Sequence, residues 1–156
     1  MFPVHRPRRL RRTEGIRRLV RETHVHPNQL VLPMFFNANL KEASPIATMP
    51  GVSQLPLSEA ARAAEQAAEA RLGGVILFGL PEHKDARGSA AYDPAGPVPT
   101  AIQAMKKAVP ELVVMADVCV DEYTEHGHCG VLKEAASGEW VVDNDATIEV
   151  LSLIHI

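Results

Sequence analysis

Short apolar runs alternate with helix-like stretches along the middle of this chain, and this alternation limits the fold more than any other feature. Apolar runs of strand length lie at residues 30–36, 74–79 and 112–117. Residues 58–72 and 100–109, which separate them, have the composition and apolar spacing of helices. A strand–helix–strand–helix–strand order is typical of βαβ crossovers, so it predicts an α/β fold with a parallel sheet.

The segment from Ser58 to Leu72 gives the strongest helix prediction. It is dominated by Ala, Glu, Gln and Arg, with Ser58 placed as the N-cap and Gly73 just beyond the end. The following run, residues 74–79, is of the kind found in strands that are buried on both faces of a parallel sheet. The connection at residues 44–54 contains Pro and Gly, and we expect it to be a loop.

The predicted sheet could be open, as in nucleotide-binding folds, or closed into a barrel. The sequence contains neither a G-x-G-x-x-G turn nor a Walker motif, and this favours a barrel. A complete TIM (β/α)8 barrel takes about 250 residues. We therefore expect residues 26–151 to form the first part of a TIM barrel, truncated to about three strand–helix units.

Residues 1–25 differ from the rest of the chain in charge. Eight arginines and a single acidic residue, Glu14, lie between Met1 and Arg21, although the whole chain has a formal net charge of −3. Thr13 can cap a short helix that runs toward Thr23. A basic arm of this kind could bind nucleic acid, but its arginine run holds no aromatic residue that would stack on bases. We expect a solvated or subunit-contacting arm and no nucleic acid partner.

Other features of the sequence bear on the compartment. A membrane-spanning helix needs about 18 consecutive apolar residues, and no stretch of the sequence approaches that length. The Arg-rich start lacks the apolar core of a signal peptide. The two cysteines, Cys119 and Cys129, are too few for the disulfide framework of a secreted domain. These features predict a cytoplasmic protein with no membrane partner.

Residues 117–130 concentrate Asp, Cys and His side chains that can bind metal. Asp117, Cys119 and Asp121 occupy alternate positions, so in extended backbone they point to the same side. Two glycines in the segment allow a turn tight enough to bring Cys129 back toward Cys119. The residues leave three interpretations open: a metal site with an open coordination position, a loop of hydrogen-bonded polar groups, or a redox pair.

The order of residues in this segment resembles the metal-loop signature of the porphobilinogen synthase (delta-aminolevulinic acid dehydratase) family. The match runs from Asp117 to Leu132 as Asp-x-Cys-x-x-x-Tyr-Thr-x-His-Gly-His-Cys-Gly-Val-Leu. Shorter matches extend the resemblance over about residues 6–151. They are Arg6-Pro-Arg-Arg-Leu-Arg, Leu30-Val-Leu-Pro-Met-Phe, Met49-Pro-Gly-Val, Phe78-Gly and Val142-Asp-Asn-Asp-Ala-Thr.

The resemblance implies a fold and an activity. The fold is an eight-stranded α/β barrel whose N-terminal arm wraps a neighbouring subunit in octamers and related homo-oligomers. The activity is the condensation of two 5-aminolevulinate molecules into porphobilinogen with loss of two waters, a hydro-lyase reaction of haem and tetrapyrrole biosynthesis. The reaction needs two Schiff-base lysines from later barrel strands. The five lysines present match none of the catalytic motifs, so we expect the chain to be inactive alone.

The resemblance also implies a metal. In zinc-dependent members three cysteines of this loop hold the ion, and two of them match Cys119 and Cys129. Asp121 stands in the place of the third, which makes the site harder and leaves magnesium possible. We expect zinc, held by Cys119 and Cys129 with help from Asp121 or from His128, which adjoins Cys129.

Two further residues gain expected roles from the resemblance. Asp117 would line the active site, and Phe78 would lie near the pocket for one substrate. The alternatives are a hydrogen-bonded carboxylate at a strand end and a core aromatic side chain. Residues 152–156 do not resemble the family's continuation, and we expect a non-native tail. Two rival functions remain: a non-catalytic metal- or nucleic-acid-binding module, and another metal-dependent barrel enzyme such as an aldolase.

Overall fold

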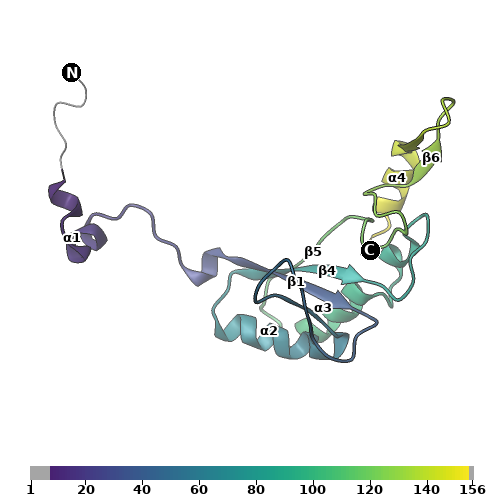
Figure 1. Cartoon of the computed structure of the whole chain (residues 1–156). Helices are drawn as coiled ribbons and strands as arrows, with labels where there is room; N and C mark the ends of the chain where they lie inside the picture. Colours follow the sequence, from purple (N-terminus) through teal and green to yellow (C-terminus); the bar gives the residue numbers. More distant parts are fainter. Residues whose placement is uncertain (1–7, 155–156) are drawn as a thin grey trace, which may run out of the picture.

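The computed structural model describes residues 8–154, whose centre is a five-stranded sheet in the order β2-β3-β1-β4-β5 (Figure 1). Strands β3, β1, β4 and β5 are parallel to one another, and β2 pairs with the outer side of β3 in the antiparallel direction. The predicted α/β fold with a parallel sheet is therefore confirmed. The strands are β1 Val31–Asn37, β2 Ser44–Pro45, β3 Ser53–Leu55, β4 Gly74–Leu80 and β5 Val114–Ala116.

Helices α2 (Ala60–Glu69) and α3 (Pro97–Ala108) cover one face of the sheet (Figure 1). Both were predicted, but their starts differ from the prediction. Ser58 is not the N-cap of α2, because a 3-10 turn at Leu57–Glu59 has already begun to wind the chain. Helix α3 begins at a proline, whose fixed φ suits the first helical position.

Alternate side chains of the two longest strands form a core with these helices. Met34 and Phe36 of β1, with Val75 and Leu77 of β4, are buried on the helix side of the sheet. They meet a row of buried alanines on α2, together with Ala101 and Met105 of α3, and we call this group the helix-side core. The small alanine side chains let α2 lie close to the sheet. The alanines are Ala60, Ala63, Ala64 and Ala67.

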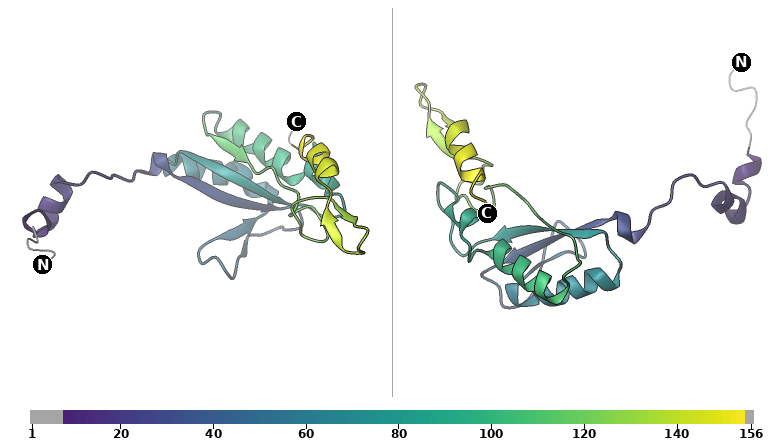
Figure 2. Two further views of the ribbon diagram at one scale, coloured as in Figure 1. Left: turned by 90° about the horizontal axis from the view of Figure 1, so that it is seen from above. Right: turned by 180° about the vertical axis from the view of Figure 1, so that it is seen from behind.

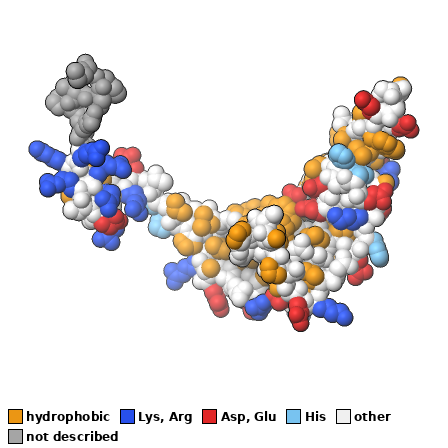
Figure 3. Space-filling model, in the orientation of Figure 1, with side chains coloured by type: hydrophobic (Ala, Val, Ile, Leu, Met, Phe, Trp, Pro, Cys, Tyr) orange, Lys and Arg blue, Asp and Glu red, His pale blue; other side chains and the backbone are white. Residues whose placement is uncertain are grey.

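The opposite face of the sheet, which we call the open face, carries the remaining apolar side chains of the strands. Phe35 of β1 stacks on Phe78 of β4 with ring centroids 5.1 Å apart. Ile76 points to the same side as Phe78, and its neighbour in β5, Met115, is 39% exposed. Figure 3 shows hydrophobic side chains gathered over the central strands. No helix within residues 8–154 covers this face.

The connection at residues 44–54, predicted as a loop, contains β2 and most of β3. Strand β3 forms because its backbone pairs with the end of β1, where Phe35 aligns with Gln54. The side-chain amide of Asn37 also donates a hydrogen bond of 2.8 Å to the Gln54 side-chain oxygen. Strands of two or three residues are too short to show alternation, so their sequence holds little sign of them.

The C-terminal region projects from one end of the sheet (Figure 2). It comprises loop 117–130, a hairpin of β6 (Leu132–Glu134) and β7 (Trp140–Val142), and helix α4 (Asn144–Leu151). Asp143 caps α4 by accepting a hydrogen bond from the Ala146 amide. The region has its own small apolar cluster, which we call the loop-side cluster: Ala91, Val120, Tyr123, Val131, Val150 and Ile154.

The N-terminal arm extends away from the sheet (Figure 1). Thr13 caps helix α1 (Glu14–Leu19) by accepting a hydrogen bond from the Ile16 amide, as predicted. Short 3-10 turns at Arg9–Arg11 and Pro27–Gln29 flank it. Basic side chains surround the arm (Figure 3). The start of the predicted arm, residues 1–7, lies outside the described residues.

Within residues 8–154, no helix has both the length and the apolar character that crossing a membrane requires.

Candidate metal centre

The loop at residues 117–130 leaves the sheet at the edge where its parallel strands end. Strand β5 ends at Ala116, and the Asp117 amide continues the ladder by donating to the Leu77 carbonyl at 3.2 Å. The chain then turns sharply, since the amides of Tyr123 and Thr124 both donate to the Val120 carbonyl. The carboxyl ends of parallel strands are where α/β folds place their ligand sites.

Three side chains of this loop converge on one point. Cys119, Asp121 and Cys129 each offer one ligand atom, and these atoms all lie within 4.8 Å of one another. Cys119 and Asp121 flank the turn at Val120, whereas Cys129 returns from the far end of the loop. Gly127, at φ +70°, supplies the reversal that returns it.

A hydrogen bond across the loop keeps it folded back. The Thr124 hydroxyl donates to the His128 carbonyl at 3.1 Å, directly before Cys129. Thr124 is almost fully buried, whereas His128 is exposed, so the bond ties the outer part of the loop to its buried part. The expected approach of Cys129 to Cys119 is therefore confirmed.

His128 lies outside the three-residue group, so its role as a ligand stays a prediction. Its backbone amide donates to Nδ1 of His126 at 3.1 Å. An Nδ1 atom that accepts a hydrogen bond leaves the ring proton of the neutral imidazole on Nε2. Nε2 of His126 then donates to the Ala86 carbonyl, 3.2 Å away. Both ring nitrogens of His126 are thus engaged within the protein.

The charge around the group favours a cation. Burial, followed by a hydrogen bond with Asp121, raises the pKa of the Cys119 thiol to about 12. Burial also raises the pKa of Glu122 to about 7, helped by repulsion from Asp121 and Asp117 and opposed by Lys84. Sequence reasoning missed the partial burial of Glu122, because an acidic residue in a loop is expected to be exposed.

The donor set fits a metal ion. Two sulfurs and one carboxylate oxygen are three protein ligands, and catalytic zinc sites bind three and leave a fourth position open. A bound cation would favour the deprotonated forms of Cys119 and Asp121, which otherwise repel each other. Of the three interpretations left open by the sequence, the metal site accounts best for this convergence.

Asp117 and Phe78 lie at the same end of the sheet but outside the group. Asp117 sits at the end of β5, where its charge acts on Glu122 and Tyr123. Phe78 stacks on Phe35 in the open face. The roles of Asp117 and Phe78 in substrate binding stay predictions.

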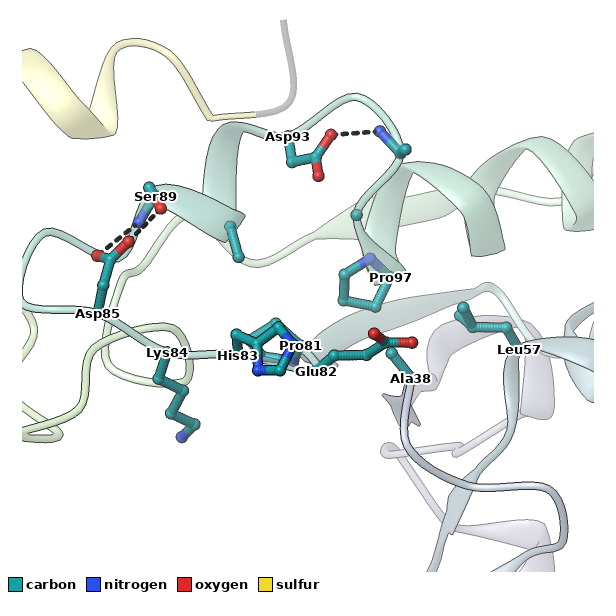
Figure 4. A pocket seen from close by; sticks show the side chains of 13 residues that line it. Ala38, Leu57, Pro81, Glu82, His83, Lys84, Asp85, Ser89, Asp93 and Pro97 are labelled. Carbon is teal, nitrogen blue, oxygen red and sulfur yellow. Dashed lines mark hydrogen bonds between the residues drawn. The ribbon is translucent and has the colours of Figure 1, made fainter.

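A cavity of about 530 Å³ opens between the ends of β1 and β4 and the start of α3 (Figure 4). Ala38, Pro81 and Pro97 form part of its wall, and the loop after β4 contributes Lys84 and Asp85. Neither Asp117 nor Phe78 lines it.

Comparison with known proteins relates this geometry to a family. Residues 4–156 match the family model of delta-aminolevulinic acid dehydratase. Proteins of that name from Streptomyces coelicolor and Mycobacterium leprae are 48% and 49% identical over 151 and 150 residues. These alignments cover 95% and 94% of this chain and 44% of each relative.

A solved structure agrees. Delta-aminolevulinic acid dehydratase (porphobilinogen synthase) from Toxoplasma gondii ME49, crystallised with its reaction product porphobilinogen, matches with a TM-score of 0.82 and 34% sequence identity. The match covers 97% of this chain and 43% of that chain, a TIM barrel, so only part of a barrel is present here. The sequence, the partial barrel and the converging cysteines agree: the chain belongs to the delta-aminolevulinic acid dehydratase family.

Proposed function

We propose that this chain carries the metal-binding part of a porphobilinogen synthase active site. The observation that carries the proposal is the convergence of Cys119, Asp121 and Cys129 within 4.8 Å, in a chain whose family match spans residues 4–156. The whole enzyme would condense two 5-aminolevulinate molecules into porphobilinogen. A non-catalytic module or an aldolase explains neither the family match nor the 0.82 TM-score.

The proposed metal is zinc, held by Cys119, Cys129 and Asp121. Thiolate ligands favour zinc over magnesium, which binds oxygen donors almost exclusively. When bound, the metal supplies Lewis-acid activation of a substrate oxygen. Asp121 lowers the softness of the site relative to three thiolates, so magnesium remains the ion to test against zinc. His128 is the further donor that we propose from its place beside Cys129.

The residues around the metal group would bind and orient substrate. The Phe35–Phe78 stack lies on the open face, which would become the interior of a closed barrel. Phe78 would form an apolar wall for one 5-aminolevulinate. Asp117, at the end of β5, would accept a hydrogen bond from the amino group of the same substrate.

The lysines of this chain do not supply the Schiff bases. Lys106 and Lys107 lie on α3, Lys133 lies on β6, and Lys41 and Lys84 lie in loops. None lies in a strand of the five-stranded sheet, so none projects from the open face. In our proposal both Schiff-base lysines belong to the part of the family sequence that the 44% coverage leaves out.

Further proposals concern the context of the chain. The sheet would form about the first three strand–helix units of a closed barrel, and the basic arm would contact a neighbouring subunit of a homo-octamer. The location would be cytoplasmic. The non-native origin of residues 152–156 also stays a prediction, although Ile154 is buried in the loop-side cluster.

Activity assays with 5-aminolevulinate test this function. We expect no porphobilinogen from the 156-residue chain alone. We expect porphobilinogen from a chimera in which the unmatched part of the Streptomyces coelicolor relative follows residue 151. Cys129→Ala in that chimera should lower activity and zinc content together. The proposal is contradicted if the folded chimera makes no porphobilinogen. It is also contradicted if Cys129→Ala changes neither the activity nor the zinc content of the chimera.

A further inference from the structure

The loop between β4 and α3 lies directly against residues 117–130, which we call the metal-binding loop. The Asp85 amide donates to the Tyr123 carbonyl at 3.3 Å, and the Glu125 amide donates to the Asp85 carbonyl at 3.1 Å. These bonds form an isolated parallel bridge between Asp85 and Thr124. The His126 ring adds a third bond, to the Ala86 carbonyl. Two loops far apart in the sequence are therefore joined by backbone pairing.

The Asp85 side chain fixes the shape of its own loop. One carboxylate oxygen accepts hydrogen bonds from the amides of Arg87 at 2.8 Å and Ser89 at 3.1 Å, and the other accepts from the Ser89 hydroxyl. The hydrogen bond from the Ser89 hydroxyl is the main cause of a lowered pKa at Asp85, and the backbone amide bonds lower that pKa further. We call residues 85–89 the Asp85 turn.

The Asp85 turn fits closely against the metal-binding loop. Gly88 adopts φ +65°, and a Cβ atom there would lie 3.2 Å from Cβ of Val120 and 3.3 Å from Cγ2 of Thr124. Val120 and Thr124 are almost fully buried beneath the turn, as is Tyr123. The contact leaves little room for the metal-binding loop to shift.

The supported residues adjoin every member of the metal group. Val120 separates Cys119 from Asp121, and Thr124 holds the His128 carbonyl directly before Cys129. A displacement of Val120 or Thr124 would therefore change the distances among the three ligand atoms.

We propose that the Asp85 turn is a template that sets the spacing of Cys119, Asp121 and Cys129, with Asp85 and His126 as positioning residues that touch neither metal nor substrate. The inference rests on the proposed metal function, which it deepens. Partners that orient metal ligands typically change metal affinity by about 10–100-fold when removed. Asp85 acts through the backbone, so we expect the lower end of that range.

Metal titration of the full chain tests the template. Asp85→Ala should weaken Zn²⁺ affinity about tenfold, measured by competition with a chromophoric chelator. Asp93→Ala is the matched control, because Asp93 closes a similar turn in the same loop by accepting from the Ala95 amide. The Zn²⁺ affinity of the Asp93→Ala variant should equal that of the wild type. Ser89→Ala should weaken binding, and Ser89→Thr, which keeps the hydroxyl, should restore it.

A second probe separates the template from the metal proposal. Phenylarsine oxide reacts with two neighbouring thiols, forming two sulfur–arsenic bonds and releasing one water, so it reports the Cys119–Cys129 spacing without any metal. Asp85→Ala should slow this reaction and Asp93→Ala should not. If the wild type binds the arsenical but not Zn²⁺, the metal proposal fails while the template stands.

Two results would contradict the proposal that the Asp85 turn is a template. If the Asp85→Ala variant matches the wild type in both its Zn²⁺ affinity and its rate of reaction with the arsenical, the template proposal is overturned. If Asp85→Ala loses its circular dichroism signal, Ser89→Ala and His126→Phe decide the question. Wild-type behaviour of both of these variants then overturns the template.

Discussion

The sheet with its helices and the C-terminal region are held together in different ways. In the sheet, β1 and β4 pair without interruption from Val31–Gly74 to Asn37–Leu80, and large apolar side chains fill the helix-side core. In the C-terminal region, a smaller apolar cluster is supplemented by side-chain hydrogen bonds and glycine turns. Burial of alternating residues therefore determines the sheet, whereas polar contacts determine the geometry of the metal group.

The largest expected effect lies in the helix-side core. Phe36 is fully buried, so Phe36→Ala should lower the free energy of unfolding by about 3–5 kcal/mol through lost burial and a cavity. Urea denaturation followed by circular dichroism measures this. Leu19→Ala is the control, since Leu19 is 84% exposed and its loss should cost less than about 0.5 kcal/mol. A small effect at Phe36 would mean that the sheet is not a packed layer.

The contact between the two regions gives the next effect. A Cβ atom at Gly79 would lie 2.5 Å from the Tyr123 hydroxyl and 2.7 Å from Cγ2 of Val98. Gly79→Ala should therefore lower the free energy of unfolding by about 1–3 kcal/mol. Adding Tyr123→Phe should recover part of the loss, because it removes the nearest atom.

The control for Gly79→Ala is Gly15→Ala. Gly15 lies in α1, and among the described residues the atom found nearest its Cβ position, apart from its chain neighbours and the helix backbone, is the Thr13 hydroxyl at 4.0 Å. There alanine should increase the helix content of α1, with a gain of up to about 1 kcal/mol. Thermal unfolding distinguishes the two variants, and equal effects at both glycines would show that the space around Gly79 admits a methyl group.

A change of ligand sharpens the comparison at the metal group. Asp121→Cys supplies a third thiolate within the same 4.8 Å group, so zinc affinity should rise about tenfold, equivalent to about 1.4 kcal/mol. Magnesium affinity should fall, because magnesium selects oxygen ligands. Chelator competition with each ion measures both changes. Unchanged zinc affinity would show that residue 121 is not a ligand.

The smallest expected effect is the response of the Asp85 turn to low pH. The pKa of Asp85 lies below its usual 3.8 because of its hydrogen bonds from Ser89, so the turn gains stability above pH 3.8 and loses it as pH falls through the lowered value. The amide signals of Arg87 and Ser89 should shift in nuclear magnetic resonance spectra over that acid range. Asp85→Ala should abolish the shift. A midpoint at or above 3.8 contradicts the turn's geometry.

The sequence predicted the parts of the molecule that repeat a pattern. The strands around Phe36 and Leu77 were predicted from their continuous apolar runs, and the helix around Ala64 from its helix-forming composition. Cys119 and Cys129 were recognised because two glycines allow the loop between them to fold back. Asp121 was recognised because it interrupts a known pattern of cysteines.

The parts that were missed depend on distant partners. The pairing of Gln54 with β1 and the partial burial of Glu122 arise only after the chain has folded. The Asp85 turn did have a local sign, since an Asp followed by Gly88 and Ser89 is typical of turns in which the carboxylate accepts backbone bonds. Its contact with Thr124, however, follows from no local pattern.

The most direct test of the central claim is zinc K-edge X-ray absorption of the zinc-loaded chain. The account predicts two sulfur atoms at about 2.3 Å, from Cys119 and Cys129, and oxygen or nitrogen atoms at about 2.0 Å, one of them from Asp121. A first shell of oxygen and nitrogen alone, unchanged by Cys129→Ala, would contradict it.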